Sequence, residues 1–177
     1  MTPPNLITFI RILLVPFFFT ALVSYTPGRE RERWIAFVIF LAASITDMLD
    51  GFLARVTQTR SELGRFLDPL ADKLLLLSGF LGLLFVPALA YHPPLWITVT
   101  IVFRDLMIVL GLVIIFMMKG TFAIRPNFLG KSTTAFQMAT LLAILLGWGL
   151  SVPLCYVTVV LTIVSFGVYA SRELRKL

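Results

Sequence analysis

Six apolar runs dominate the sequence, and each is about as long as the helix needed to cross a bilayer. They cover residues 7–25, 33–53, 67–90, 95–118, 133–150 and 153–171. A helix rises about 1.5 Å per residue, so roughly 20 apolar residues span a hydrocarbon layer of about 30 Å. The mean hydropathy of +0.96 is too high for a soluble domain of this size. We therefore expect an all-α integral membrane protein with six transmembrane helices, forming one domain over residues 1–177.

The distribution of basic residues predicts the orientation of these helices. With a cytoplasmic N-terminus, the outer loops hold three arginines, at 29, 31 and 33, interleaved with two glutamates. The inner side holds most of the other basic residues: Arg55, Arg60, Arg65, Lys119, Arg125, Lys131, Arg172, Arg175 and Lys176. Lys and Arg are retained in the cytoplasm during insertion. We therefore expect both termini to be cytoplasmic and the protein to lie in the cell inner membrane.

The first apolar run, the single cysteine and the basic loops limit the kinds of site and partner that this chain can have. The first apolar run contains Arg11 and has no evident cleavage site after it, so we expect it to be retained and not cleaved as a signal sequence. Cys155 is the single cysteine, which excludes an internal disulfide and a cysteine metal site. The basic inner side suits anionic lipid headgroups. We expect a lipid bilayer, and no nucleic acid, as partner.

Four aspartates stand close together within residues 46–73, between two apolar runs. Asp47 and Asp50 are three residues apart at the end of one expected helix. Asp68 and Asp72 are four residues apart at the start of the next. Residues at these spacings share a helix face. Two carboxylate pairs can therefore face each other across one cleft.

Four ionised carboxylates beside hydrocarbon need neutralisation. Hard divalent cations such as Mg²⁺, Mn²⁺ or Ca²⁺ accept all-oxygen ligation, and four carboxylates with water can hold one or two of them. Two-metal sites clamp the attacking and leaving oxygens of phosphoryl displacement. The alternative is a solvated charge patch, in which the aspartates pair with Arg55, Arg60, Arg65 and Lys73. Four acids at helical spacing favour the metal site.

Small residues accompany the aspartates and leave room for a ligand near the backbone. They are Gly51, Ala54 and Gly64. The full pattern, eight fixed positions over 26 residues, reads Asp47-x2-Asp50-Gly51-x2-Ala54-Arg55-x8-Gly64-x3-Asp68-x3-Asp72. It resembles the signature of the CDP-alcohol phosphotransferase family.

The resemblance implies a membrane enzyme of six helices with its active site on the cytoplasmic side. Such an enzyme transfers a phosphatidyl or similar group from a CDP-linked lipid to an alcohol and releases CMP. It implies two Mg²⁺ or Mn²⁺ ions, with ligands Asp47, Asp50, Asp68 and Asp72. Asp72 is the candidate base for the acceptor hydroxyl, with a role as metal ligand alone as the alternative.

The same resemblance assigns the binding of the nucleotide. The CDP moiety would contact Asp50, Gly51, Ala54, Arg55 and Gly64, with Arg55 opposite phosphate charge. The resemblance also implies a homodimer, although no heptad pattern or stripe of small residues identifies its interface.

Other segments resemble the phosphatidylglycerophosphate synthase and cardiolipin synthase branches of the family. They are PPNLITFIRILLVP, DPLADKLL, FRDLMIV and LGKSTTAFQM. Arg104 lies well inside an apolar run and needs an anionic partner, which is either a carboxylate such as Asp105 or the phosphate of an acceptor. Arg125 and Lys131 would help to hold that phosphate. We expect CDP-diacylglycerol as donor and an anionic alcohol, first glycerol 3-phosphate, as acceptor.

Three departures from the phosphatidylglycerophosphate synthase pattern favour the cardiolipin synthase branch, in which phosphatidylglycerol supplies the attacking hydroxyl. Asp105 replaces a glutamate, Leu112 and Val113 stand where a further arginine is usual, and Thr133 replaces a second lysine. Inositol phosphate and serine are lesser alternatives. An ion transporter also places carboxylates at helix ends. The gathering of the acids on one side, within the signature, favours the enzyme over a transporter or a purely structural protein.

Overall fold

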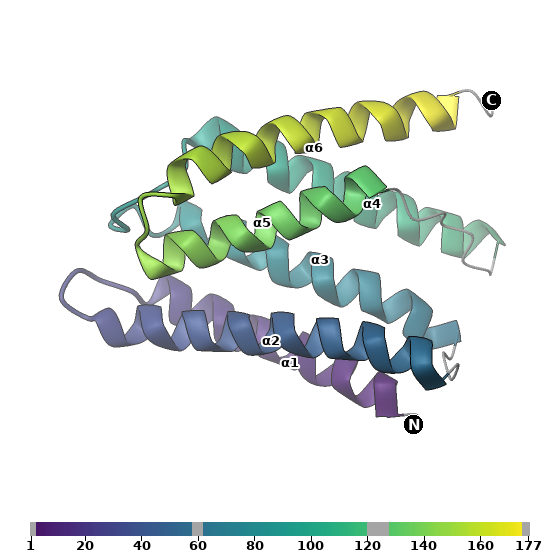
Figure 1. Ribbon diagram of the computed structural model, residues 1–177, viewed down its shortest axis with the longest axis horizontal. Coiled ribbons are helices and arrows are strands. Elements are labelled where there is room, and N and C mark those ends of the chain that lie inside the picture. The colour runs from purple at the N-terminus through teal and green to yellow at the C-terminus, as the bar shows by residue number, and fades with distance from the viewer. Residues whose placement is uncertain (1–2, 58–61, 120–127, 175–177) are drawn as a thin grey trace.

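Six α-helices and their connections make up the described part of this computed structural model (Figure 1). The structure describes the backbone of residues 3–57, 62–119 and 128–174, and the side chains of 8–46, 67–111, 113, 114, 117 and 129–168. The helices are α1 (Pro3–Val23), α2 (Glu30–Thr57), α3 (Glu62–Leu84), α4 (Leu95–Lys119), α5 (Phe128–Leu146) and α6 (Ser151–Leu174). These ranges contain no strand, so the all-α prediction is confirmed for them.

Each apolar run corresponds to one helix, but several helix ends differ from the sequence-based boundaries. Pro3 belongs to the first turn of α1, where a missing N–H leaves no hydrogen bond unmade. The third helix begins at Glu62, so Asp68 and Asp72 lie inside it and not at its start. This helix also ends early, at Leu84. The turn of α3 that carries Asp68 and Asp72 is therefore preceded and followed by further turns of the same helix.

Gly147 explains why α5 stops at Leu146. Its φ of +70° is one that L side chains rarely adopt. The Gly147 N–H donates to Ile144 O at 3.0 Å, and the Trp148 N–H donates to Ala143 O at 2.9 Å. These two bonds form a Schellman motif, which satisfies carbonyls at the end of the helix.

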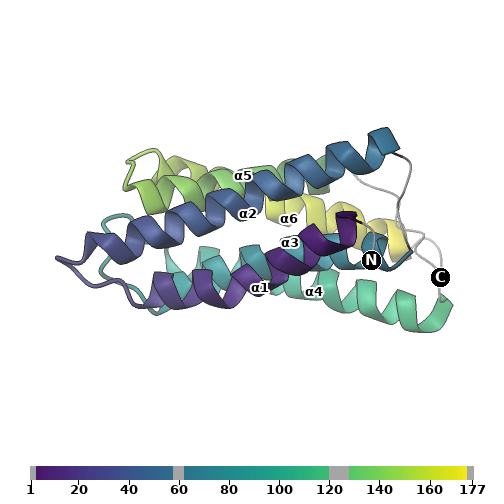
Figure 2. The ribbon, with the colours of Figure 1, turned by 90° about the horizontal axis from the view of Figure 1, so that it is seen from below.

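The helices run in alternating directions, and their packing brings α3 to the middle of the bundle (Figure 2). α1 packs mainly against α2 and α3, α5 packs mainly against α6, and α4 contacts α3 and α6. Gly79 and Gly82 let neighbours approach α3 closely: a Cβ at Gly79 would lie 2.7 Å from Leu141, and one at Gly82 would lie 2.6 Å from Leu22. The buried apolar cluster around these contacts holds α1, α3 and α5 together.

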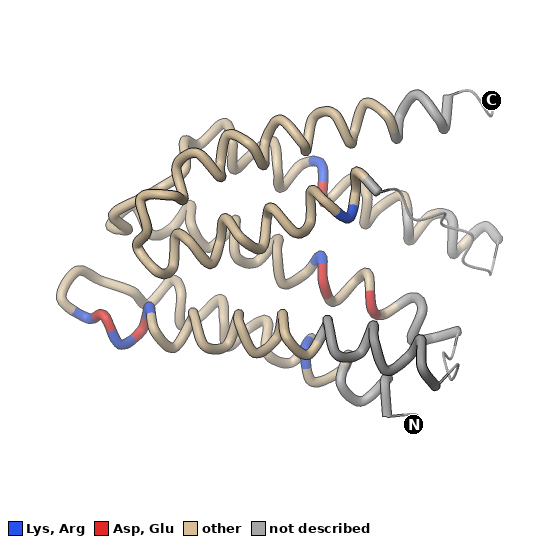
Figure 3. Tube along the Cα trace, in the orientation of Figure 1, with Lys and Arg blue, Asp and Glu red and all other residues tan. Residues whose placement is uncertain are grey.

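Charged residues are absent from a stretch in the middle of the described helices (Figure 3). Glu30 and Arg33 form a 2.9 Å ion pair near the turn between α1 and α2. Beyond that turn the described helices carry no Lys, Arg, Asp or Glu until Arg11, Lys73, Arg104 and Lys131. The start of α1, the end of α6 and the facing ends of α2 and α3 lie at the opposite end of the bundle.

Two helices meet the length and apolarity of a membrane span within the described residues. The qualifying segments are Leu129–Leu146 and Ser151–Val168, and Thr8–Val23 is a shorter apolar run. Core helices of soluble proteins can have the same length and apolarity. Large apolar side chains are nevertheless exposed on every helix, among them Phe17, Val38, Leu81, Phe103, Phe136 and Val160. Such an apolar surface is unusual for a protein in water.

Candidate active site

Asp68 and Asp72 project from one face of α3, one turn apart, in the half of the helix nearest its start. Both side chains are partly buried. Asp68 Oδ1 accepts a hydrogen bond of 2.5 Å from the hydroxyl of Thr8, which is fully buried on α1. The bundle therefore holds one of the predicted metal ligands by a contact between two helices.

The other signature residues lie on helices whose backbone is described but whose side chains are outside the described set. Asp47, Asp50, Gly51, Ala54 and Arg55 are on α2, and Gly64 is on α3. These two helices are in contact. Among the described side chains no three His, Cys, Asp or Glu groups come together. The described half of the predicted site, two carboxylates at helical spacing, is an all-oxygen donor set that fits a hard divalent cation.

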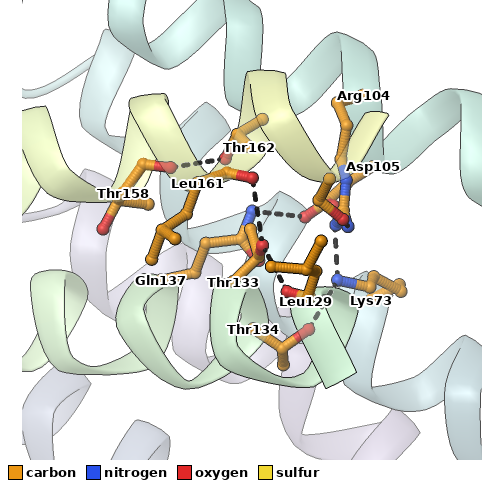
Figure 4. Close-up of polar contacts among 11 residues, drawn as sticks. Lys73, Arg104, Asp105, Leu129, Thr133, Thr134, Gln137, Thr158, Leu161 and Thr162 are labelled. Carbon is orange, nitrogen blue, oxygen red and sulfur yellow. Dashed lines mark hydrogen bonds and ion pairs between the residues drawn. The ribbon is translucent and has the colours of Figure 1, made fainter. Parts of the chain in front are cut away.

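A second polar cluster is centred on Asp105 of α4 and joins four helices (Figure 4). Asp105 is 1% exposed. Its Oδ1 accepts from Lys73 Nζ at 3.2 Å and from Arg104 Nη1 at 2.7 Å. Its Oδ2 accepts from Gln137 Nε2 at 3.0 Å. Lys73 also donates to Thr134 at 3.1 Å, and Arg104 to Ser165 at 3.0 Å.

This cluster, which we call the Asp105 network, carries one more positive than negative charge. Lys73 and Arg104 are 8% and 4% exposed, and Asp105 is the single carboxylate that the described contacts give them. Arg104 lies nine residues beyond the start of α4, a rise of about 14 Å along the helix axis. A charge excess at that depth favours a negatively charged ligand nearby.

Two polar stripes pack α5 against α6 beside the Asp105 network. On α5 the stripe is Thr133, Gln137 and Thr140, and on α6 it is Thr158, Thr162 and Ser165. All six are buried. Thr140 and Thr158 hydroxyls lie 2.8 Å apart, and Thr133 Oγ1 lies 3.3 Å from Leu161 O. Hydrogen bonds between helices are a common form of packing where the surroundings are apolar.

The structure places the three predicted acceptor residues differently. Arg104 is buried and pairs with Asp105, the neighbouring carboxylate that the sequence offered as its structural partner. Lys131 is exposed near the start of α5. Arg125 lies outside the described residues. A Cβ at Gly130 would lie 4.0 Å from Arg104 Nη2, an ordinary contact distance, so the start of α5 lies beside the guanidinium.

The sequence analysis did not predict the pairing of Lys73 with Asp105, the other polar partners in the Asp105 network, or the contact from Thr8. Lys73 was considered as a partner of the signature aspartates, but its described partners are Asp105 and Thr134. Gln137 and Ser165 were not singled out. The signal was present in the spacing: polar residues recur at i, i+4 and i+7 within both of the last two apolar runs.

Comparison with known proteins decides the family. The family model described as CDP-alcohol phosphatidyltransferase matches residues 1–164. The chain belongs to the CDP-alcohol phosphatidyltransferase family. The resemblance seen in the signature is thereby confirmed, and metal dependence is a general feature of this family of membrane enzymes.

Relatives of this chain fall in both branches that the sequence indicated. A Mycobacterium tuberculosis protein named "Probable phosphatidylglycerophosphate synthase" is 40% identical over 102 residues, 58% of this chain and 47% of its own length. A Streptomyces coelicolor "Cardiolipin synthase (CMP-forming)" is 35% identical over 76% of this chain and 60% of its own. A Pectobacterium atrosepticum CDP-diacylglycerol–glycerol-3-phosphate 3-phosphatidyltransferase is 32% identical over 90% and 87%. The chain thus spans about half the length of the mycobacterial relative.

The Asp105 network predicts unequal effects of removing its charges. Asp105→Ala leaves two buried cations without their carboxylate and should destabilise the fold by about 3–5 kcal/mol. Lys73→Met leaves Asp105 paired with Arg104 and Gln137, so the loss should be limited to hydrogen bonds of about 1.5–3 kcal/mol. Reversible unfolding in detergent micelles measures both. Equal losses would show that Asp105 is not the centre of the network.

Proposed function

We propose that this protein transfers the phosphatidyl group of CDP-diacylglycerol to glycerol 3-phosphate, forming phosphatidylglycerophosphate and releasing CMP. The observation that carries the proposal is the complete aspartate signature, of which Asp68 and Asp72 share one face of α3. The match to the family model over residues 1–164 supports the reaction class. The names of the enterobacterial and mycobacterial relatives support the acceptor.

The reaction needs a divalent cation, for which Asp47, Asp50, Asp68 and Asp72 are the ligands in this proposal. When bound, two Mg²⁺ or Mn²⁺ ions neutralise the diphosphate and stabilise the CMP that leaves. Gly51, Ala54 and Gly64 leave room for the nucleotide along the backbone. Arg55 offsets phosphate charge.

Asp72 acts as the base for the acceptor hydroxyl, in addition to binding the metal. As a carboxylate it accepts the proton of the acceptor hydroxyl, whose oxygen attacks the lipid-linked phosphorus directly. The bond from phosphorus to the CMP oxygen breaks as the new bond forms, so no covalent intermediate with the protein is needed. The alternative is that Asp72 is a metal ligand only.

The acceptor site is assigned to the Asp105 network. Its excess positive charge suits the phosphate of glycerol 3-phosphate. Gly130 lies beside Arg104, and the exposed Lys131 follows it near the start of α5. Arg125 completes the proposed grip on the phosphate. A cationic alcohol would be repelled by the same charges.

Cardiolipin synthesis is the second candidate, with phosphatidylglycerol as the acceptor. The Streptomyces coelicolor relative supports it. So does Thr133, which is buried and bonded to backbone carbonyls of Leu129 and Leu161, so the position offers no second cation to a small phosphate. Phosphatidylglycerol also carries a phosphate, which the Asp105 network would accept. Transport of ions is a distant third, since the aspartates gather at one side of the bundle.

The placement in the membrane belongs to the same proposal. All six helices of a single domain, residues 1–177, span the inner membrane, with both termini and the aspartates on the cytoplasmic side. The exposed apolar side chains support a place in lipid, and the basic residues of the inner loops support the orientation. It gives the site lipid for the diacylglycerol chains and water for CMP. The homodimer stays a prediction.

Removing one carboxylate tests the proposed metal site. Asp68→Asn keeps an oxygen that accepts the hydrogen bond from Thr8, so the fold should survive. CMP release from CDP-diacylglycerol in Mg²⁺ should nevertheless fall by orders of magnitude, because the amide is a poor ligand. The control is Glu30→Gln, which removes an acid at the other end of the bundle. Near-normal turnover by folded Asp68→Asn would refute the proposal.

Replacing Arg104 separates an acceptor role from a structural one. Arg104→Ala leaves Asp105 with Lys73 and Gln137, so the protein should fold. The KM for glycerol 3-phosphate should rise about tenfold or more, since a hydrogen bond to a charged group contributes about 1.5–3 kcal/mol. The KM for CDP-diacylglycerol should change less.

Arg33→Ala is the charge-matched control for this comparison, because Arg33 lies near the start of α2, at the other end of the bundle from the aspartates. Equal rises in KM for both substrates of Arg104→Ala would assign Arg104 a purely structural role.

A further inference from the structure

The Thr8 hydroxyl joins α1 to α3. It donates to Oδ1 of Asp68, 60 residues away in the sequence, at 2.5 Å. Many helical threonines donate to the backbone carbonyl four residues earlier in their own helix, as Thr20 and Thr100 do here. The bond from Thr8 is different in kind, because its acceptor is a carboxylate of the signature. Thr8 is 0% exposed.

We propose that Thr8 is a positioning residue for the metal site: its hydroxyl fixes the orientation of the Asp68 carboxylate. The inference rests on the proposed function, in which Asp68 is a metal ligand. A carboxylate on a helix can rotate about its side-chain bonds, and a hydrogen bond to one oxygen removes that freedom. The ligand is then oriented before the cation arrives.

The acceptor and its surroundings support this role. A hydrogen bond from a hydroxyl to a carboxylate is stronger than one between two neutral groups. Hydrogen-bond partners of metal ligands orient them, and their loss typically lowers metal affinity about 10–100-fold. Helix α1 can hold Thr8 in place because it packs closely on α3, with Leu22 against Gly82 and Phe18 against Gly79.

Binding of Mn²⁺ to the purified protein in detergent, measured from the electron paramagnetic resonance signal of the free ion, tests the inference without an activity assay. Thr8→Val keeps the shape of the side chain but removes the donor, and should weaken Mn²⁺ binding about 10–100-fold. Thr8→Ser keeps the donor and should bind within about threefold of the wild type.

The matched control is Thr98→Val. Thr98 is also 0% exposed, and its hydroxyl has no hydrogen-bond partner among the described residues. Replacing it should leave Mn²⁺ affinity unchanged, because only a buried hydroxyl without a partner is lost. The pair Thr8→Val and Thr98→Val thus compares the same substitution at two buried helix positions.

The outcomes separate this inference from the proposed function. Wild-type Mn²⁺ affinity in folded Thr8→Val, or equal weakening in Thr8→Ser and Thr8→Val, would overturn the role of Thr8. Asp68→Asn, measured in parallel, should also bind Mn²⁺ weakly. If Asp68→Asn binds normally, the proposed metal site itself fails, and the role of Thr8 with it.

A further variant covers the case in which Thr8→Val does not fold. Thr8→Cys is of similar size and donates only weakly. It should bind Mn²⁺ more weakly than Thr8→Ser, and equal affinity of these two variants would again overturn the inference.

Discussion

The interaction on which the interior of this bundle depends is the set of hydrogen bonds to Asp105. An ionised carboxylate inside an apolar helix bundle is stable only with positive partners and with hydrogen bonds to both oxygens. Lys73 of α3, Arg104 of α4 and Gln137 of α5 supply them. Arg104 in turn bonds Ser165 of α6. One carboxylate therefore sets the relative placement of four helices at the depth where the proposed acceptor binds.

The same constraint explains how the bundle divides its polar groups. Between the charged first turn of α2 and the Asp105 network, the described helices carry a stretch without charged residues, and Asp68 and Asp72 lie beyond it with the network. Lys73 follows Asp72 directly on α3, so the helix that presents the proposed metal ligands is also anchored to α4 and α5. Thr8 joins that helix to α1 from another side. Fold and site are thus held by the same contacts.

Local patterns predicted the helices and the shared face of Asp68 and Asp72, whereas contacts between helices could not be predicted from them. Apolar runs indicated six helices because their length and hydropathy are properties of neighbouring residues. Helix ends were predicted less well: α1 already includes Pro3, and α3 spans Glu62–Leu84 although the apolar run covers 67–90. The spacing of Asp68 and Asp72 showed that they share a face.

Contacts between residues far apart in the sequence could not be predicted from local patterns. Nothing local connects Thr8 with Asp68, or Lys73 with Asp105, because such pairs depend on how the helices pack. The polar stripes of α5 and α6 could have been predicted, because polar residues at helical spacing within an apolar run indicate a buried helix face. The family match then supported the reaction class that the signature had indicated.

The identity of the lipid product tests the central claim most directly. Purified protein in detergent micelles would be incubated with CDP-diacylglycerol, Mg²⁺ and equal concentrations of glycerol 3-phosphate and phosphatidylglycerol, and the lipids analysed by mass spectrometry. The proposed function predicts phosphatidylglycerophosphate, in amounts equal to the CMP released, and none when the cation is chelated. Cardiolipin as the product would transfer the assignment to the second candidate. No new lipid and no CMP would contradict phosphatidyl transfer.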